Sequence, residues 1–227
     1  MIFVNGFSIG EAYIKLLNNV LSYGSKVKDE RGYETVECTN MVTRVTNPLG
    51  YDFGLSVPVY QLVNVPNGCF WGGERLKVYC EEFLDKNRNG FVYTYGNRLR
   101  GWFDGTDQIQ VAIDRLRKYK NSRRAVSITW DVETDTRVDD VPCLMLVDFK
   151  IRDGKLETTA VWRSHDIYGA WFPNVVGLTY LTQYVAKQLD NINIGSIVVH
   201  SISAHVYMND YNNALRISRK NKRFGVI

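Results

Sequence analysis

Apolar residues follow two different periods along this chain, and segments of the two kinds are mixed without a regular order. Helical spacing predicts helices over residues 9–22, 74–85, 107–119 and 174–190. Runs rich in β-branched and aromatic residues predict strands over residues 34–46, 55–63, 125–131, 142–152, 155–163 and 196–208. Because strands and helices do not alternate as in a doubly wound fold, the pattern predicts an α+β fold with helices packed against a mixed sheet.

Local signals predict where several of these elements end. Ser8 is expected to cap the first helix and Gly24 to stop it, and Thr106 is expected to cap the helix over 107–119. Asp153-Gly154 lies between two strands and is a strong hairpin signal. No internal repeat or low-complexity linker divides the 227 residues, so we expect a single domain over residues 1–227.

Charge and cysteine usage argue against several classes of protein. The 28 basic and 24 acidic residues leave a net charge of +4, which is too mild to indicate a nucleic-acid-binding protein. Four scattered cysteines without a CxxC pair predict neither a disulfide framework nor a metal site, and reduced thiols suit a cytoplasmic protein. We find no signal-type N-terminus and no apolar run of about 18 residues, so we expect no membrane span.

Two short motifs could carry chemistry. Pro142-Cys143 stands at the head of an apolar strand, where a lone cysteine is more often a packed core residue than a reactive one. In Arg163-Ser164-His165-Asp166, a guanidinium fork and a hydroxyl could together hold a phosphate. The alternative for this second motif is a surface ion pair between Arg163 and Asp166.

Three further motifs are weaker on their own. Arg123 and Arg124 follow a helix, where a solvated loop is the plainer interpretation. His205 and Tyr207 lie two apart in a strand and therefore face one side, although a buried core histidine is the alternative. The basic C-terminal segment could instead bind nucleic acid, through Arg216, Arg219, Lys220, Lys222 and Arg223.

The order of these motifs is specific, although each alone is weak. Arg31, then FVYTYGNRLRGW, SRR, PC, RSHD, a later Asn and HVY follow one another in an order and spacing that resembles the thymidylate synthase family. The likeness is best over residues 93–207, and the form of FVYTYG and SRRAV is most similar to the short archaeal branch. It implies an α+β sandwich around a large, bent mixed sheet with flanking helices, and a homodimer packed sheet to sheet. It also implies reductive methylation of dUMP to dTMP, with a methylene-tetrahydropterin (a folate or an archaeal tetrahydromethanopterin type) as donor of carbon and hydride.

The resemblance implies a role for each matching residue. Cys143 would be the nucleophile that attacks C6 of uracil, with Tyr95 beside it and Trp71 and Tyr79 nearby. The nucleotide would be bound by Arg31, Arg163 and Ser164 at its phosphate, by Arg123 and Arg124 from the neighbouring subunit, by Asn174 at the pyrimidine edge, and by His205 and Tyr207 at the ribose. Asp166 and the C-terminal Ile227 would contact the pterin. The family's catalytic glutamate has no secure match, and Glu74 is our candidate, with Glu81 and Glu82 behind it.

These residue types suit the implied chemistry. Only the thiolate of a cysteine attacks carbon, and we expect arginines near Cys143 to lower its pKa. The Asn174 carboxamide offers a donor and an acceptor that match O4 and N3–H of uracil, whereas an aspartate would suit cytosine. Leu144, Trp162 and Ala170 depart from the family pattern. They leave open a hydroxymethylase of dUMP or dCMP, in which water replaces the hydride.

Overall fold

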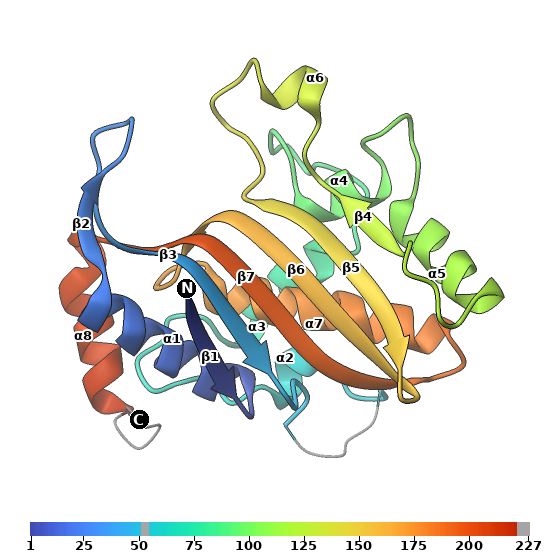
Figure 1. The fold of residues 1–227 in the computed structure, drawn as a ribbon, viewed down its shortest axis with the longest axis horizontal. Coiled ribbons are helices and arrows are strands. Elements are labelled where there is room, and N and C mark those ends of the chain that lie inside the picture. Colours follow the sequence, from blue (N-terminus) through green and yellow to red (C-terminus); the bar gives the residue numbers. More distant parts are fainter. Residues whose placement is uncertain (51–54, 222–227) are drawn as a thin grey trace.

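A seven-stranded mixed sheet forms the centre of the protein in the computed structural model, which describes residues 1–50 and 55–221 (Figure 1). Its strands are β1 (Ile2–Gly6), β2 (Ser25–Lys28), β3 (Glu34–Val45), β4 (Val126–Ile128), β5 (Leu144–Arg152), β6 (Lys155–Asp166) and β7 (Asn193–Tyr207). The helices are α1 (Ile9–Tyr23), α2 (Val59–Leu62), α3 (Gly73–Glu82), α4 (Tyr95–Arg100), α5 (Gln108–Lys118), α6 (Val132–Asp135), α7 (Trp171–Gln188) and α8 (Tyr211–Lys220), with the 3₁₀ turn η1 (Met208–Asp210).

The strand order across the sheet is β1-β3-β7-β6-β5-β4, with β2 paired to β3. The β1–β3 and β6–β7 pairs are parallel, and the other pairs are antiparallel. The long helix α7 makes the crossover between β6 and β7, as a parallel pair requires. The predicted α+β fold, with a mixed sheet and flanking helices, is confirmed.

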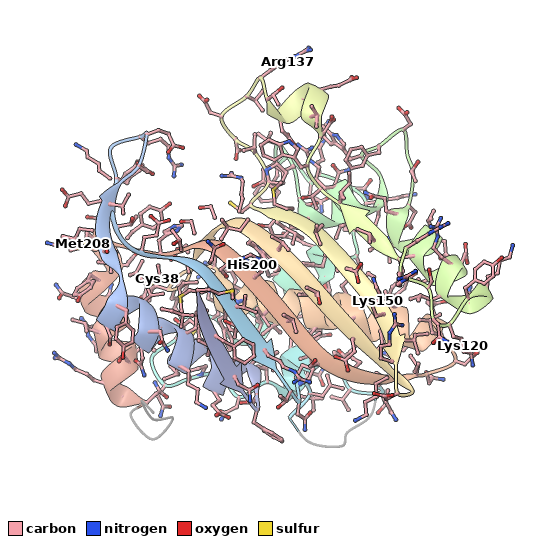
Figure 2. The ribbon with its side chains drawn as sticks, viewed as in Figure 1. Cys38, Lys120, Arg137, Lys150, His200 and Met208 are labelled. Carbon is pink, nitrogen blue, oxygen red and sulfur yellow. The ribbon has the colours of Figure 1, made fainter. Side chains whose placement is uncertain are left out.

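Helices cover only one face of the sheet. Figure 1 shows α1, α3 and α7 behind the strands, and no helix of the described residues in front of them. Helix α7 is buried along most of its length and packs against β6 and β7. The front face carries His200 and Lys150 (Figure 2), and Ile202 of β7 is exposed. A sheet with one uncovered face offers a broad surface to a partner.

Two glycines bring the helices around α3 into close contact. A Cβ on Gly177 of α7 would lie 2.4 Å from the Phe83 ring, and a Cβ on Gly96 of α4 would lie 2.0 Å from the Glu82 carbonyl oxygen. Any larger residue at either position would push α3 away from its neighbours. These contacts set the positions of Tyr79 on α3 and Tyr95 at the start of α4.

Several local predictions are confirmed. The Ser8 side chain accepts a hydrogen bond from the Glu11 backbone N–H, and Gly24 is the C-cap of α1. Asp153 and Gly154 have φ values of 49° and 73°, the left-handed pair that a two-residue hairpin turn needs.

Two local predictions were wrong. Residues 55–63 do not form a strand; they contain the short helix α2. The Gln183 side chain there accepts from Val59 N at 2.8 Å and donates to Val57 O at 2.9 Å, so a side chain replaces the ladder of a neighbouring strand. The cap of α5 is Asp107 rather than Thr106, since the Asp107 carboxylate accepts from Gln110 N.

Candidate active site

Cys143 stands just before β5, opposite Arg163 of β6. Arg163 N donates to Cys143 O at 2.8 Å. In the β5–β6 hairpin, Arg152 pairs with Lys155 and, in the same register, Leu146 pairs with Val161. If this register continued, Cys143 would pair with Ser164. It shifts by one residue between Leu144 and Leu146, however. This bulge bends the strand next to Cys143 and brings Arg163 opposite the thiol.

The Arg163 side chain folds back over the segment that carries the cysteine. Its Nε donates to Pro142 O at 2.9 Å, and its Nη2 donates to Val141 O at 3.0 Å. The same Nη2 lies 3.9 Å from Cys143 Sγ. The surface ion pair considered between Arg163 and Asp166 is not formed, because the guanidinium is bound to neutral carbonyls instead.

Burial decides the acidity of the Cys143 thiol in this ligand-free chain. It raises the pKa of Cys143, and the positive charges of Arg163 and Arg31 oppose that effect without reversing it. The expectation that nearby arginines would lower this pKa was therefore wrong in its net direction. The arginines act as expected, but the desolvation of the thiolate is larger.

Asn174 lies in the first turn of α7 and is buried. Its Oδ1 accepts a short hydrogen bond from the Tyr79 hydroxyl, and its Nδ2 lies 3.1 Å from His165 Nε2. Trp71, which precedes Tyr79 on the chain, contacts the Tyr79 ring at 5.3 Å between centroids. The structure thus places the Asn174 amide in a polar network within the core.

His205, Tyr207 and Arg31 meet at the end of β7. The His205 and Tyr207 rings lie 5.0 Å apart between centroids, as their shared face predicts. Arg31, in the exposed loop between β2 and β3, donates to the Tyr207 hydroxyl at 3.4 Å and also contacts Asp29 at 3.3 Å. Asp166 pairs with His205 across the β6–β7 ladder.

The Asp166 carboxylate closes a turn beside this group. Its Oδ1 accepts from the backbone N–H groups of Tyr168 and Gly169, both at 3.1 Å. Burial raises the pKa of Asp166. The Trp71 indole donates to Gly169 O at 2.7 Å, so an aromatic surface borders the Asp166 turn.

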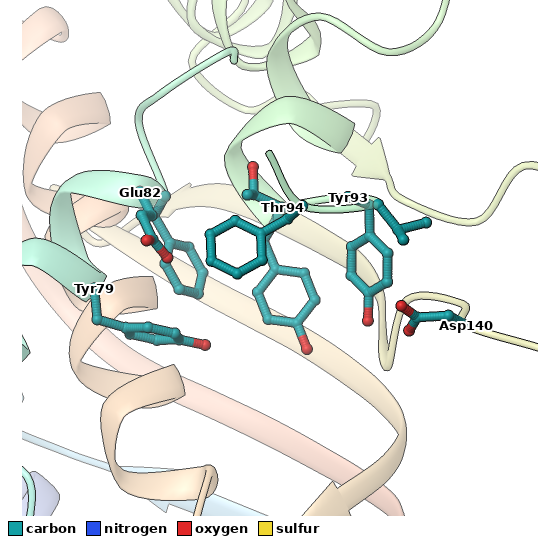
Figure 3. Close-up of a pocket in the computed structure, with 9 residues that line it drawn as sticks. Tyr79, Glu82, Tyr93, Thr94 and Asp140 are labelled. Carbon is teal, nitrogen blue, oxygen red and sulfur yellow. The ribbon is translucent and has the colours of Figure 1, made fainter. Parts of the chain in front are cut away.

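A cavity of about 300 Å³ opens beside the segment that carries Cys143, lined by Tyr79, Glu82, Phe83, Phe91, Val92, Tyr93, Thr94, Tyr95 and Asp140. Figure 3 shows the Tyr79 ring on one side of it, and the Tyr93 ring with the Asp140 carboxylate on the other. The Tyr93 hydroxyl donates to Val141 O at 3.2 Å, which ties the cavity wall to the Cys143 segment. Burial raises the pKa of Tyr79, Tyr93 and Tyr95, and Cys143 adds to that effect on all three.

The structure does not bring Glu74 into this cluster. Glu74 is in the exposed first turn of α3, with 74% of its side chain exposed, and it pairs with Lys77 at 3.0 Å. Glu82, one of the two glutamates considered behind it, lines the cavity, and burial raises its pKa. One helical face explains the difference, because Tyr79, Glu82 and Phe83 turn toward the core while Glu74 faces solvent.

Arg123 and Arg124 lie away from the Cys143 cluster. They are exposed in the loop between α5 and β4 and line a surface hollow with Lys118 and Tyr119. Ala125 O accepts from Phe149 N, six residues along β5 from Cys143, which is roughly 20 Å at strand spacing. The two arginines therefore do not reach the thiol of their own chain.

Three other predicted residues are placed as follows. Ser164 follows Arg163 in β6 and pairs with Ser203 of β7. Ile227 lies outside the described residues, as do Lys222 and Arg223 of the basic segment. The rest of that segment forms α8, which buries Ala214 and Ile217.

Sequence reasoning assigned no role to His165, Tyr93 or Asp140. Tyr93 and Tyr95 are separated by one residue, which was a usable signal because both rings line the cavity. His165 and Asn174 are nine residues apart on different elements, and no local pattern indicates that they touch. Among residues 1–50 and 55–221, no three His, Cys, Asp or Glu side chains gather as metal ligands, and no helix is long and apolar enough to cross a membrane.

Comparison with known proteins bears on this cluster. Residues 67–226 match the family model described as thymidylate synthase. A protein named "Putative thymidylate synthase" from Methanothermobacter marburgensis is 52% identical over 92% of this chain and 94% of its own length. A protein of the same name from Methanothermobacter thermautotrophicus is 51% identical over 91% of this chain and 93% of its own length. One from Methanocaldococcus jannaschii is 34% identical over 88% of this chain and 88% of its own length. The chain therefore belongs to the thymidylate synthase family of methyltransferases, and it is similar to archaeal members.

Proposed function

We propose that the chain methylates dUMP at C5 to give dTMP, with Cys143 as the nucleophile. The observation that carries this proposal is the Arg163 guanidinium, which lies 3.9 Å from the Cys143 sulfur, is bound to two neutral carbonyls and has no carboxylate partner among the described residues. A positive charge without a carboxylate partner suits an anionic ligand beside a thiol. The family of the chain makes that ligand the phosphate of a nucleotide.

The residues divide the work in a chemically consistent way. Cys143 adds to C6 of uracil, and this covalent bond makes C5 nucleophilic. Electron density then develops at O4, where the Asn174 amide can donate a hydrogen bond. Arg163, Arg31 and Ser164 bind the phosphate, while His205 and Tyr207 bind the ribose hydroxyl. Tyr95, Glu82 and Tyr79 line the cavity. We propose that Glu82 and the Tyr79 hydroxyl transfer protons near O4, the role first considered for Glu74.

The pterin co-substrate has a suitable surface beside this site. Asp166 offers a half-buried carboxylate that the backbone N–H groups of Tyr168 and Gly169 hold in place, and Trp71 borders the same turn. A methylene-tetrahydrofolate or tetrahydromethanopterin bound there supplies the one-carbon unit and the hydride. We propose Asp166 and the C-terminal Ile227 as contacts to it.

Methylation is preferred over hydroxymethylation because of where Trp162 lies. Trp162 departs from the family pattern, but it is fully buried, and its indole donates to the Tyr95 hydroxyl at 3.3 Å. It packs edge to face against Tyr95, so it supports a wall of the cavity and is not part of its lining. The product still decides between the two reactions.

Trapping of the nucleophile tests the proposal. The protein is incubated with 5-fluoro-dUMP and either methylene-pterin, and its intact mass is measured. We expect an adduct that is lost in Cys143→Ala and kept in the matched control Cys69→Ala. No adduct, or an adduct that survives Cys143→Ala, would reject the mechanism. Analysis of the product from dUMP then separates dTMP from hydroxymethyl-dUMP.

We further propose a cytoplasmic homodimer that packs through the uncovered face of the sheet. Arg123 and Arg124 lie far from the Cys143 of their own chain, which supports a role in binding the phosphate at the partner's site. The four free cysteines suit a reducing compartment such as the cytoplasm. Arg124→Ala and Cys143→Ala proteins are each expected to be inactive and to regain activity when mixed. Failure of the mixture to recover, with dimers present, would reject the shared site.

A further inference from the structure

His165 is a buried histidine next to the proposed pyrimidine site, and the proposed chemistry does not use it. It is 1% exposed, in β6 two residues after Arg163. Its Nε2 lies 3.1 Å from Asn174 Nδ2, and its Nδ1 lies 3.0 Å from Ser201 Oγ. Both ring nitrogens therefore have polar partners in the core.

The chemistry of the partners fixes the direction of each hydrogen bond. An amide nitrogen only donates, so His165 Nε2 must accept from Asn174. Burial lowers the pKa of His165 well below its usual range, so the ring is neutral and its one proton is on Nδ1. That proton is donated to the Ser201 hydroxyl.

The other end of the Asn174 amide is also bound. The Tyr79 hydroxyl donates to Asn174 Oδ1. A carboxamide has two donor hydrogens and two acceptor lone pairs, and Tyr79 and His165 use one of each. One donor and one acceptor remain, which is the set that O4 and N3–H of uracil require.

Orientation, and not residue type alone, decides which pyrimidine this amide recognises. A half-turn of the carboxamide exchanges its oxygen and nitrogen, and the exchanged pattern fits N3 and the amino group of cytosine. A turned Asn174 would place its oxygen against the lone pair of His165 Nε2. Turning therefore also requires the ring proton to move from Nδ1 to Nε2 and the Ser201 hydroxyl to reverse.

The His165 ring is itself held in place. It stacks on the Trp162 indole, with centroids 4.7 Å apart and planes at 18°. Trp162 in turn donates to the Tyr95 hydroxyl. Both stacked rings are buried, so neither can turn away without displacing core neighbours.

We propose that His165 is a positioning residue that, with Tyr79, holds the Asn174 carboxamide in the orientation for uracil and against cytosine. The inference rests on the proposed function, because it assigns the specificity of the same site. The preference for dUMP over dCMP would then depend on the hydrogen-bonded series of Ser201, His165, Asn174 and Tyr79.

Binding of dUMP and dCMP by isothermal titration calorimetry tests this inference. In His165→Phe, which keeps a ring but no acceptor, we expect the dUMP preference over dCMP to fall roughly 10-fold. Ser201→Ala should lower it roughly threefold, because it frees the tautomer. His165→Gln should keep most of it, since its carbonyl can accept from Asn174. The matched control is Thr179→Val, which removes a buried hydroxyl of α7 that donates to Val175 O of the same helix.

The outcomes separate the inference from the function. Wild-type protein that binds no dUMP would reject the proposed function. Wild-type protein that prefers dUMP, with an unchanged preference in folded His165→Phe, would overturn the role of His165 alone. If His165→Phe does not fold by circular dichroism, Ser201→Ala decides, and an unchanged preference there overturns the inference. A loss as large in Thr179→Val would also overturn it, as a general effect of core damage.

Discussion

Two arginines near Tyr93 are bound in opposite ways. Arg98 of α4 is 1% exposed and forms a two-pronged ion pair with Asp135 of α6, at 2.7 and 3.0 Å. Its guanidinium also stacks over Trp102 at 3.7 Å. Arg163 binds two backbone carbonyls and approaches a thiol, and no carboxylate of the described residues lies within ion-pair distance of it.

The difference separates a structural charge from an available one. The charge of Arg98 is neutralised by Asp135 inside the protein, so it can stabilise the fold but cannot bind an anion. Neutral carbonyls orient Arg163 without neutralising it, so its positive charge is left for a ligand. Both arginines touch the segment before Cys143, since Asp135 belongs to it and Val141 accepts from Arg163.

The largest expected effect is on the structural arginine. Asp135→Ala leaves Arg98 buried without its partner, and we expect the free energy of unfolding to fall by about 3–5 kcal/mol. Urea denaturation followed by circular dichroism measures this. The control is Asp114→Ala, which breaks an exposed ion pair with Arg117. The free energy of unfolding should fall by less than about 1 kcal/mol in this variant. Equal losses in the two variants would remove the distinction between the arginines.

Arg163→Gln should have the converse effect. We expect dUMP affinity to fall roughly 10- to 100-fold, since hydrogen bonds to a charged group contribute about 1.5–3 kcal/mol. The free energy of unfolding should fall less than in Asp135→Ala, because Arg163 is only partly buried and its loss leaves two neutral carbonyls rather than an unpaired buried charge. Calorimetry and urea denaturation on the same samples give both numbers. A variant that is strongly destabilised yet binds dUMP normally would make Arg163 a structural residue like Arg98.

The approach of Arg163 to Cys143 was only partly predictable. Asp153-Gly154 predicted the β5–β6 hairpin, and a two-residue turn fixes the register near it. That register alone points Ser164 toward Cys143. The bulge between Leu144 and Leu146 corrects it by one residue, and no sequence signal marks the bulge because both residues are apolar. The Arg163-Ser164 motif indicated a phosphate ligand, and the family resemblance, rather than the hairpin rule, implied that Arg163 lies near Cys143.

Contacts between distant elements account for the remaining misses. Residues 55–63 have a strand-like composition, but a glutamine from α7 satisfies their backbone and tertiary contact overrides propensity. The family resemblance implied Asn174 as the pyrimidine contact, whereas its contacts with His165 and Tyr79 come from two other elements. Glu74 and Glu82 differ in the face of α3 that they occupy, and only the packing of α3 against α7 decides which face is inside.

The smallest expected effect concerns the acidity of Cys143, and it tests whether the Arg163 charge acts on the Cys143 sulfur. Burial raises the pKa of Cys143, so fewer thiolates exist at neutral pH and alkylation should rise with an inflection above about 8.5. Arg163 opposes that rise, so Arg163→Gln should move the inflection still higher. Iodoacetamide labelling of the Cys143 peptide, followed by mass spectrometry across neutral to alkaline pH, measures both. Arg117→Gln, a surface change far along the chain, should leave the curve in place. An inflection at the same pH in Arg163→Gln would show that the Arg163 charge does not act on the Cys143 sulfur and is neutralised within the protein, like that of Arg98.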